Sequence, residues 1–424
     1  MASLIFITSS YLPSPDANGA CVSQVIAQLR KEGHRIICIC SKNDDQMAYE
    51  VSEGVEIYRV KKTLYALLLE RTRENGGKTI SLKILTLLRR IRSLMLLPVF
   101  PNTEPRRAGE IYRLVESIAG KRAIDCVIGA FRPFEGVSAA IRIKKKHPGI
   151  VCGGYYLDIM KGSAVSGLLP QKMYSRLCDK RELKIFGRLD FVLMAEAGPP
   201  IYGTPFFKAV EAKIRYINFP LLRNISEEAH RTAVYDKEYL NIVYAGYLDS
   251  AYRNPSFIFK VIETLCRRGC KIRIHLYGRS DCGEIIDKYC RRNPDNFRYY
   301  GQVDGAAARG AILSADAVLN ISNRTENIVP SKVFELFSSC KPIINVITNP
   351  DDPCLGYFSR YPCVCTLDGH KENIEAEAGK LMEFLYNGNS ATVSYEEIEP
   401  LYYSSTPAAT TGIINEYLLK ESRA

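Results

Sequence analysis

The sequence predicts an α/β protein built from two doubly wound, Rossmann-like domains. Short, uniformly apolar runs alternate with stretches of helical apolar spacing, which is typical of parallel strands covered by helices on both faces. This alternation begins at the N-terminus and begins again near residue 240, and 424 residues suit two domains. We therefore expect a first domain over 1–220, a second over 221–395, and a C-terminal helix within 396–424 that crosses back to the first domain.

The first half contains apolar runs that we interpret as strands. These runs are Leu4–Thr8, Arg35–Cys40, Glu56–Val60, Cys126–Ala130, Ile150–Tyr156, Phe191–Ala195 and Ile214–Phe219. Between several of them the apolar residues recur at helical spacing, as Val25, Ile26 and Leu29 do. The expected helices are Ser23–Lys31, Val137–Lys146 and Lys172–Phe186.

The second half repeats the pattern after a polar junction near Pro220–Glu238. Its expected strands are Leu240–Ala245, Ile272–Tyr277, Arg298–Tyr300, Ala317–Ile321, Pro342–Val346 and Cys363–Leu367. Its expected helices are Phe257–Arg267, Glu284–Arg291, Ala306–Leu313 and Ser331–Ser338, followed by a final helix over Thr410–Lys420.

Composition narrows the class of protein. Hydrophobic residues are 46% and charged residues 24% of the chain, which indicates a folded globular protein. No run approaches the roughly 20 apolar residues of a membrane-spanning helix, and the first basic residue is Arg30, which argues against a secretory signal. Fourteen cysteines without a CxxC pair and five scattered histidines suggest reduced thiols and no metal site. We expect a cytoplasmic protein.

A basic insertion at about 61–110 carries eleven lysines and arginines against four acidic residues. Within 81–97 one helical stripe of apolar side chains has basic flanks, and such a helix can lie on an anionic membrane surface. The stripe is Ile84, Leu88, Ile91 and Met95, and the flanks are Lys83, Arg89, Arg90 and Arg92. Alternatively, the stripe packs on the domain's own core. Aromatic and basic residues do not interleave here, so we expect no nucleic acid partner.

Three loops are candidates for a binding site. The first follows the first strand and contains Asn18-Gly19, where backbone can approach a ligand closely, although an ordinary turn is the alternative. The second runs from Gly246 after the first strand of the second domain and places Arg253 where it could meet a phosphate or remain a solvated surface charge.

The third loop and the helix after it are the strongest candidate. Pro330-Ser331 is a helix-start signal, and the free N–H groups of a helix start attract phosphate. Lys332 adds a positive charge, and Glu335 one turn later suits the hydroxyls of a ribose. Alternatively, Ser331 is only an N-cap and both charged side chains are solvated.

The order of these motifs resembles the GT-B glycosyltransferases of the large retaining class that uses nucleotide-sugar donors. The matching stretches are Tyr11–Pro13 with Asn18-Gly19 and Leu29–Arg35, Tyr244–Pro255, Leu276–Arg279, Tyr300–Val303, Ser314–Leu319, and Val329–Glu335 followed by Cys340–Ile344. The resemblance implies two Rossmann-like domains that face each other across a cleft. It also implies an acceptor-binding first domain and a donor-binding second domain.

The resemblance also implies roles for individual residues in donor binding. The base would contact Gln302 and Val303, Glu335 would bind the ribose, and Arg253 and Lys332 would hold the diphosphate with the helix start at Val329–Ser331. The expected donor-site residues are Asn18, Gly19, Gly246, Arg253, Gly278, Arg279, Gln302, Val303, Asn327, Val329, Pro330, Ser331, Lys332 and Glu335. Arg253 and Lys332 would also assist catalysis by stabilising the leaving nucleoside diphosphate.

The chain departs from the family at two positions. Asn327 stands where many members have the first glutamate of a Glu-x7-Glu motif, and Tyr247 stands where many have arginine. On the acceptor side, Asp158 and Glu135 are alternative catalytic bases. The sequence contains no Asp-x-Asp triplet that would hold a divalent cation on the diphosphate, so we expect a metal-independent reaction without a cofactor.

These observations predict a glycosyltransferase that moves a sugar from a nucleotide-diphosphate donor to a glycan acceptor, expected to be lipid-linked, in the biosynthesis of cell-surface polysaccharide or glycoconjugate. The partners would be the nucleotide sugar, the acceptor and, through 81–97, the inner face of the membrane. Two alternatives remain open: a nucleotide-sugar 2-epimerase of the same architecture, and a non-catalytic GT-B partner or scaffold protein.

Overall fold

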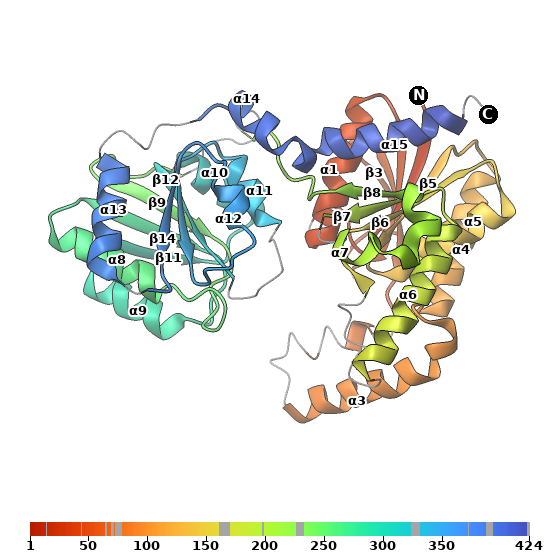
Figure 1. Cartoon of the computed structure of the whole chain (residues 1–424), viewed down its shortest axis with the longest axis horizontal. Coiled ribbons are helices and arrows are strands. Elements are labelled where there is room, and N and C mark those ends of the chain that lie inside the picture. The colour runs from red at the N-terminus through yellow and green to blue at the C-terminus, as the bar shows by residue number, and fades with distance from the viewer. Residues whose placement is uncertain are drawn as a thin grey trace. The chain divides into compact units, whose positions relative to one another are not determined.

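The computed structural model describes residues 1–13, 15–43, 45–63, 66–68, 72, 79–160, 170–196, 199–225, 233–323, 331–371, 373–386 and 393–421. The chain divides into two compact units (Figure 1). The first unit comprises Met1–Pro220 together with Pro407–Ala424, and the second comprises Leu221–Thr406. Each unit is a largely parallel sheet with helices on both faces.

The sheet of the first unit has the strand order β3-β4-β2-β1-β5-β6-β7-β8, and only the β3–β4 pair is antiparallel. Its strands are β1 (Ser3–Ile7), β2 (Arg35–Lys42), β3 (Tyr49–Ser52), β4 (Val55–Lys61), β5 (Cys126–Phe131), β6 (Val151–Tyr156), β7 (Phe191–Ala195) and β8 (Ile214–Ile217). Because both faces of the central strands are covered, β5 and β6 are buried at every residue.

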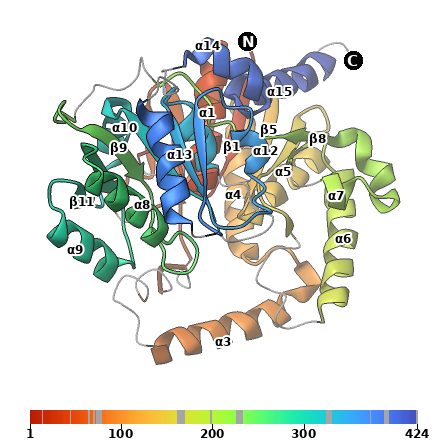
Figure 2. The ribbon, with the colours of Figure 1, turned by 60° about the vertical axis from the view of Figure 1, so that its left-hand side comes forward.

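Helices pack on both sides of this sheet. They are α1 (Ala17–Lys31), α3 (Thr79–Met95), α4 (Pro105–Ala119), α5 (Phe134–Lys146), α6 (Gln171–Gly187), α7 (Pro199–Tyr202) and α15 (Pro407–Glu421), with 3₁₀ helices η1 (Leu97–Val99) and η4 (Pro205–Lys213). Helix α15 packs beside α1, where Thr411 and Asn415 donate hydrogen bonds to the carboxylate of Glu32 at 2.7 and 2.9 Å. Both views show α3 projecting away from the sheet (Figures 1 and 2).

The sheet of the second unit is fully parallel, with strand order β11-β10-β9-β12-β13-β14. Its strands are β9 (Leu240–Ala245), β10 (Ile272–Tyr277), β11 (Phe297–Gly301), β12 (Ala317–Ile321), β13 (Ile343–Ile347) and β14 (Val364–Asp368). Numbered along the chain this order is 3-2-1-4-5-6, which is the order of the doubly wound dinucleotide-binding fold.

The helices of the second unit cover both faces, with α8 and α13 on one face and α10 and α11 on the other (Figure 1). They are α8 (Ser256–Arg267), α9 (Gly283–Arg292), α10 (Gly305–Ser314), α11 (Lys332–Phe337), α12 (Leu355–Phe358), α13 (Ile374–Tyr386) and α14 (Tyr395–Ile398), with the 3₁₀ helix η5 (Glu399–Ser405). In η5, Tyr402 stacks on Phe337 with ring centroids 4.5 Å apart, so this late segment belongs to the core of the second unit.

The predicted fold class, two doubly wound α/β units, is confirmed, and every strand expected from the sequence is present. The sequence analysis missed β3 and, among the helices of ten residues or more, α4 and α13. Strand β3 pairs only with β4 at the sheet edge and buries none of its residues, so its four residues lack the apolar signal of the inner strands. None of the described helices is long and apolar enough to span a membrane.

Candidate functional site

The strand order of the second unit reverses between β9 and β12. The connections on the two sides of such a reversal run in opposite directions, which leaves a crevice at the carboxyl ends of the two strands. The loop after β9 begins at Gly246 and reaches Arg253, and Ser322 and Asn323 follow the end of β12. These two loops therefore frame the expected position for a ligand.

Three polar side chains from two distant parts of the sequence meet at this crevice. Arg253 donates a 2.6 Å hydrogen bond from Nε to Oδ1 of Asn323. Both line an inner cavity of about 20 Å³ together with Lys332, and both also line an outer hollow of about 250 Å³ beside Tyr247. We call Arg253, Asn323 and Lys332 the crevice cluster.

The crevice cluster holds two cations, and two carboxylates lie nearby: Asp352 lines the inner cavity and Asp249 lines the outer hollow. Within the described residues, no ion pair joins Arg253 or Lys332 to an acidic side chain. Burial lowers the pKa of the Lys332 ammonium; Glu335 opposes this shift, and the neighbouring Arg253 adds to it. Because two like charges in one cavity destabilise each other, a bound anion would stabilise both.

Close packing of two loops demands glycine at the mouth of this crevice. A Cβ on Gly278 would lie 2.1 Å from the carbonyl oxygen of Gly246, and Gly278 has φ +128°. A Cβ on Gly246 would lie 3.3 Å from Nζ of Lys332. The loops after β9 and β10 can therefore approach each other this closely only because Gly278 lacks a side chain.

The loop that carries Arg253 is held by its own hydrogen bonds. Oδ1 of Asp249 accepts from the backbone N–H groups of Ala251 and Tyr252 at 2.8 and 2.9 Å. Oδ1 of Asp281 accepts from the N–H of Ser250 at 2.7 Å. This loop is thus organised before any ligand arrives, which favours binding because less ordering is needed.

Other expected donor-site residues lie on neighbouring loops. Nε of Arg279 donates to the side-chain oxygen of Gln302, which joins the loops after β10 and β11. Val303 is partly buried and precedes Asp304, whose side chain caps α10 through the N–H of Ala307. No hydrogen bond or ion pair joins Arg279 or Gln302 to Lys332 in the part of the chain that the structure describes.

The third loop is described only from Ser331 onward. Asn327, Val329 and Pro330 lie outside the described residues, so their expected roles stay predictions. Ser331 is the N-cap of α11 and makes no side-chain capping bond. Glu335 is exposed on the first turn of α11 and acts electrostatically on Lys332.

Sequence reasoning missed Asn323 and Asp352. Asn323 follows β12 at the same sheet edge as Arg253, so the position of the strand ends was the signal that could have found it. Asp352 follows β13 and lines the inner cavity, with Oδ1 accepting from the N–H of Cys354 at 2.8 Å and Oδ2 buried without a hydrogen-bond partner. Sequence gave no reason to prefer Asp352 over Asp351.

In the first unit the structure brings Asn18 and Asp158 together. Nδ2 of Asn18 donates to Oδ2 of Asp158 at 3.2 Å, across the carboxyl ends of β1 and β6. Oδ1 of Asp16 accepts from the N–H of Gly19 at 2.8 Å, and a Cβ on Gly19 would lie 2.6 Å from the carbonyl oxygen of Ser10. The first candidate loop is therefore a capped, tightly packed start of α1.

Glu135 is a different kind of carboxyl. It lies in the first turn of α5 and is only 2% exposed, and its Oε2 has no hydrogen-bond partner. Burial raises the pKa of this carboxyl; its own backbone N–H and Arg107 oppose the shift. No described hydrogen bond joins Glu135 to Asp158.

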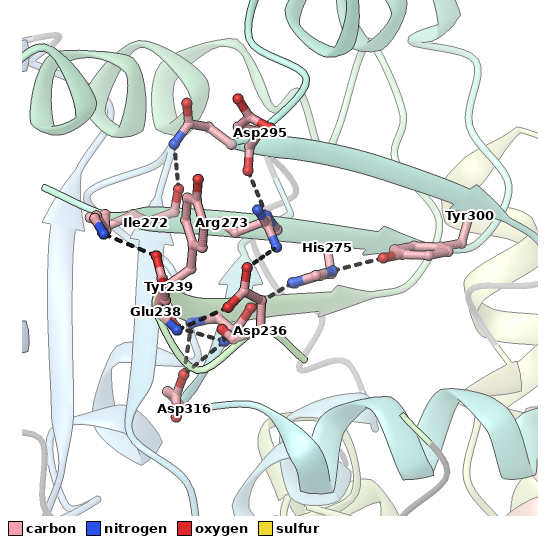
Figure 3. Close-up of polar contacts among 12 residues, drawn as sticks. Asp236, Glu238, Tyr239, Ile272, Arg273, His275, Asp295, Tyr300 and Asp316 are labelled. Carbon is pink, nitrogen blue, oxygen red and sulfur yellow. Dashed lines mark hydrogen bonds and ion pairs between the residues drawn. The ribbon is translucent and has the colours of Figure 1, made fainter. Parts of the chain in front are cut away.

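A buried histidine of the second unit is not a further base. The ring of His275 lies between Tyr300, 3.0 Å from Nδ1, and Asn241, 3.0 Å from Nε2, in a polar cluster along β9 and β10 (Figure 3). Burial, with smaller contributions from Arg273 and Arg298, lowers its pKa to about 4. His275 is therefore neutral at physiological pH and serves the packing of the sheet.

The apolar stripe expected at 81–97 lies on α3. Leu88, Ile91 and Met95 are 51%, 48% and 75% exposed, so these three side chains do not pack on the domain's core. The side chains of Lys83, Ile84 and Arg89 lie outside the described residues. Contact with a membrane stays a prediction.

The sequence matches no protein-family model and no curated protein. Solved structures are similar over nearly the whole chain. Sucrose-phosphate synthase from Thermosynechococcus elongatus has a TM-score of 0.57 at 10% identity, over 99% of this chain and 100% of that one. HepE from Anabaena, in complex with UDP, has a TM-score of 0.53 at 10% identity over 99% and 100%.

A third similar structure is a lipopolysaccharide outer core galactosyltransferase, with a TM-score of 0.51 at 13% identity over 98% of this chain and 99% of that one. At this level of identity the likeness shows the fold alone. The chain has the GT-B fold of nucleotide-sugar glycosyltransferases, and the resemblance expected from the motifs is confirmed at the level of fold.

Proposed function

We propose that the protein is a glycosyltransferase that transfers a sugar from a nucleotide-diphosphate donor. The observation that carries the proposal is the crevice cluster: Arg253, Asn323 and Lys332 converge at the carboxyl ends of β9 and β12, and among the described residues neither cation makes an ion pair with a carboxylate. A diphosphate group is the ligand that such a pair of cations at such a crevice fits best.

The chemistry follows from where charge develops. As the bond between sugar and diphosphate breaks, negative charge grows on the leaving nucleoside diphosphate. The diphosphate would occupy the outer hollow beside Arg253, and Lys332 would act from the inner cavity behind it. Positive groups that are already in place stabilise that charge without reorganising, and removing one such contact typically costs about 2.7–4 kcal/mol in the transition state.

The nucleotide would be held by the neighbouring loops. Glu335, exposed one turn into α11, would accept hydrogen bonds from the ribose hydroxyls, and the backbone near Gln302 and Val303 would contact the base. Among the similar structures, HepE is described in complex with UDP, which supports a nucleotide in this fold. We propose that retention of configuration and independence from metal ions accompany this donor site.

On the acceptor side, Asp158 and Glu135 are the proposed alternatives for the base. Asp158 is partly exposed and held by Asn18, so its carboxylate could accept a proton from an incoming hydroxyl. We further propose a lipid-linked glycan acceptor in cell-surface biosynthesis, reached through a peripheral contact of α3 with the cytoplasmic membrane face. The exposed Leu88 and Ile91 support this step.

One observation favours a second candidate, a non-catalytic partner protein that keeps the fold. Tyr247, 45% exposed, stands beside the outer hollow where many relatives of the resembled family carry arginine. Such a protein would bind nucleotide or another chain without turning over a sugar donor.

Calorimetric titration of UDP, GDP, ADP and CMP, with and without magnesium, tests the proposal. We expect one nucleoside diphosphate to bind selectively without magnesium, and Glu335→Ala to weaken it strongly. The exposed Lys288 on α9 provides a matched control as Lys288→Ala, which should bind like the wild type. Absence of binding for every nucleotide would refute the donor site, whereas binding without hydrolysis or transfer of any sugar donor would favour the non-catalytic candidate.

A further inference from the structure

The first unit contains a second cavity that the proposed donor site does not use. It has a volume of about 800 Å³ and lies at the carboxyl end of β4, between the end of α3 and the start of α4. Its volume is in the range of small-molecule pockets. Five cationic residues line it: Lys61, Lys62, Arg92, Arg106 and Arg107.

The central observation is that the guanidinium of Arg107 is buried. Its residue is only 8% exposed, one Nη donates a 2.5 Å hydrogen bond to Oγ of Ser41, and its Nε has no hydrogen-bond partner. No ion pair joins Arg107 to any carboxylate among the described residues. A buried charge without a counter-ion is costly, so a guanidinium kept in this state points to an anionic ligand.

The other buried arginines differ from Arg107 in this respect. Arg59 pairs with Glu50 at 2.6 Å, and Arg273 pairs with Asp236 at 3.5 Å. Since both are neutralised inside the protein, a buried guanidinium in this chain normally has a carboxylate beside it. Arg107 instead lines the cavity.

The acidic residues of the cavity do not supply the missing counter-ion. Glu104 forms an ion pair with Arg92, with 2.7 Å between the two side chains. Glu110 is exposed on α4. Glu135 lies within electrostatic range of Arg107, but no hydrogen bond or ion pair joins the two side chains among the described residues, and burial raises the pKa of this carboxyl.

The start of α4 adds a second attraction for an anion. Helix α4 has 15 residues and begins at Pro105, and its N-cap residue Glu104 makes no side-chain capping bond. The N–H groups of the first turn, next to Arg106 and Arg107, therefore offer the positive end of the helix dipole to the same cavity. Several guanidinium groups and a helix start suit a phosphate better than a singly charged carboxylate.

One wall of the cavity is apolar. Met95 and Leu96 at the end of α3 line it, and Met95 is 75% exposed. Leu88 and Ile91 continue the exposed apolar surface along α3. A ligand that satisfies both the cations and this wall carries a phosphate group and a hydrocarbon chain.

We propose that this cavity binds the phosphate group of an alkyl phosphate ester, with Arg106 and Arg107 on the phosphate and Met95 and Leu96 along the chain. The proposal does not rest on the donor site, because binding is measured without a nucleotide sugar. A failure of one proposal therefore leaves the other standing.

The test titrates the full-length protein with dodecyl phosphate below its micelle concentration, and separately with inorganic phosphate. We expect dodecyl phosphate to bind more tightly than inorganic phosphate. The variants Arg106→Gln and Arg107→Gln should each weaken it about tenfold or more, since each removes a charge-assisted hydrogen bond. Arg113→Gln, an exposed arginine of the same helix outside the cavity, is the matched control and should bind normally.

Each alternative outcome has a definite meaning. Equal binding of inorganic phosphate overturns the role of the hydrocarbon chain. Unchanged binding in both cavity variants overturns the site. Arg107→Gln removes a buried contact and could unfold the domain, but Arg106 is exposed, so a normal thermal melt of Arg106→Gln keeps its binding result decisive.

Discussion

Replacing Lys332 by methionine should separate ligand binding from folding in the second unit. The side chain keeps a similar length and apolar stem but loses its charge. Lys332 lies in the inner cavity beside Arg253, where burial and that second cation both lower its pKa from the ordinary value of 10.5. The charged ammonium of Lys332 therefore destabilises the ligand-free fold of the wild type, and the variant lacks this charge.

The expected loss of binding follows from the kind of contact removed. A hydrogen bond to a charged group contributes about 1.5–3 kcal/mol. At about 1.4 kcal/mol for each factor of ten, the dissociation constant of the preferred nucleoside diphosphate should rise about 10- to 150-fold in Lys332→Met.

The stability of the ligand-free protein should move in the opposite direction. Because the folded-state pKa of Lys332 is lowered, the unfolded chain binds more protons than the folded one between that pKa and 10.5. Below the lowered pKa the buried charge therefore reduces the free energy of unfolding of the wild type by its full amount. The free energy of unfolding rises as the pH increases from the lowered pKa to 10.5. Lys332→Met should melt no lower than the wild type at neutral pH and should lack this gain.

Calorimetry with the nucleoside diphosphate and thermal melts between pH 7 and 10 measure both effects on the same samples. Lys288→Met, on the exposed surface of α9, controls for the loss of one surface charge. Normal binding by Lys332→Met would refute the role of the crevice cluster. A clear drop in melting temperature without ligand would refute the idea that the lysine is kept for binding at the expense of stability.

Three further perturbations test other parts of the structure. Gly278→Ala places a Cβ 2.1 Å from the Gly246 carbonyl at φ +128°, so it should lower stability by about 1–3 kcal/mol in a denaturant melt; an unchanged midpoint would contradict the packing argument. Turnover by Glu135→Gln and Asp158→Asn identifies the base. If Glu135 is the base, its raised pKa makes the wild-type rate fall as the pH drops through that value, and a flat profile would exclude it. The double variant Leu88→Ser, Ile91→Ser should reduce sedimentation with anionic lipid vesicles, and full retention would argue against membrane contact through α3.

The sequence was sufficient to predict most of the fold because each buried strand is marked by a run of several apolar residues, not by a single position. A parallel strand that is covered on both faces is apolar at nearly every position. Strands such as β5 and β6 can therefore be recognised from their own residues, without knowing which strands lie beside them. The edge strand β3 and the helix α4 escaped for related reasons. In β3 no residue is buried, and α4 combines a short apolar face with a basic first turn.

The site was only partly predictable because its residues are brought together by the order of the strands in the sheet, which the sequence does not state. Arg253 and Lys332 could be selected from local motifs, but nothing local distinguishes Asn323 from other asparagines. Asn323 holds the guanidinium of Arg253, and this contact depends on the strand order, which the local sequence does not show. The burial of Glu135 was equally invisible, since a carboxyl in the first turn of a helix is ordinarily exposed.

The two cavities share one feature: each is lined by at least one cationic side chain that makes no ion pair with a described carboxylate. At the crevice, Arg253 and Lys332 lie near the carboxyl ends of parallel strands and make no ion pair with a described carboxylate. In the first unit Arg107 lies beside Ser41, at the carboxyl end of β2, and likewise makes none. Elsewhere in the described chain, buried Arg59 and Arg273 are neutralised internally. An unneutralised cation costs stability, so its retention at strand ends is best explained by an anion that binds there and restores the loss. Each site should therefore stabilise its own unit against heat when its anion is added, UDP-like for the second unit and an alkyl phosphate for the first.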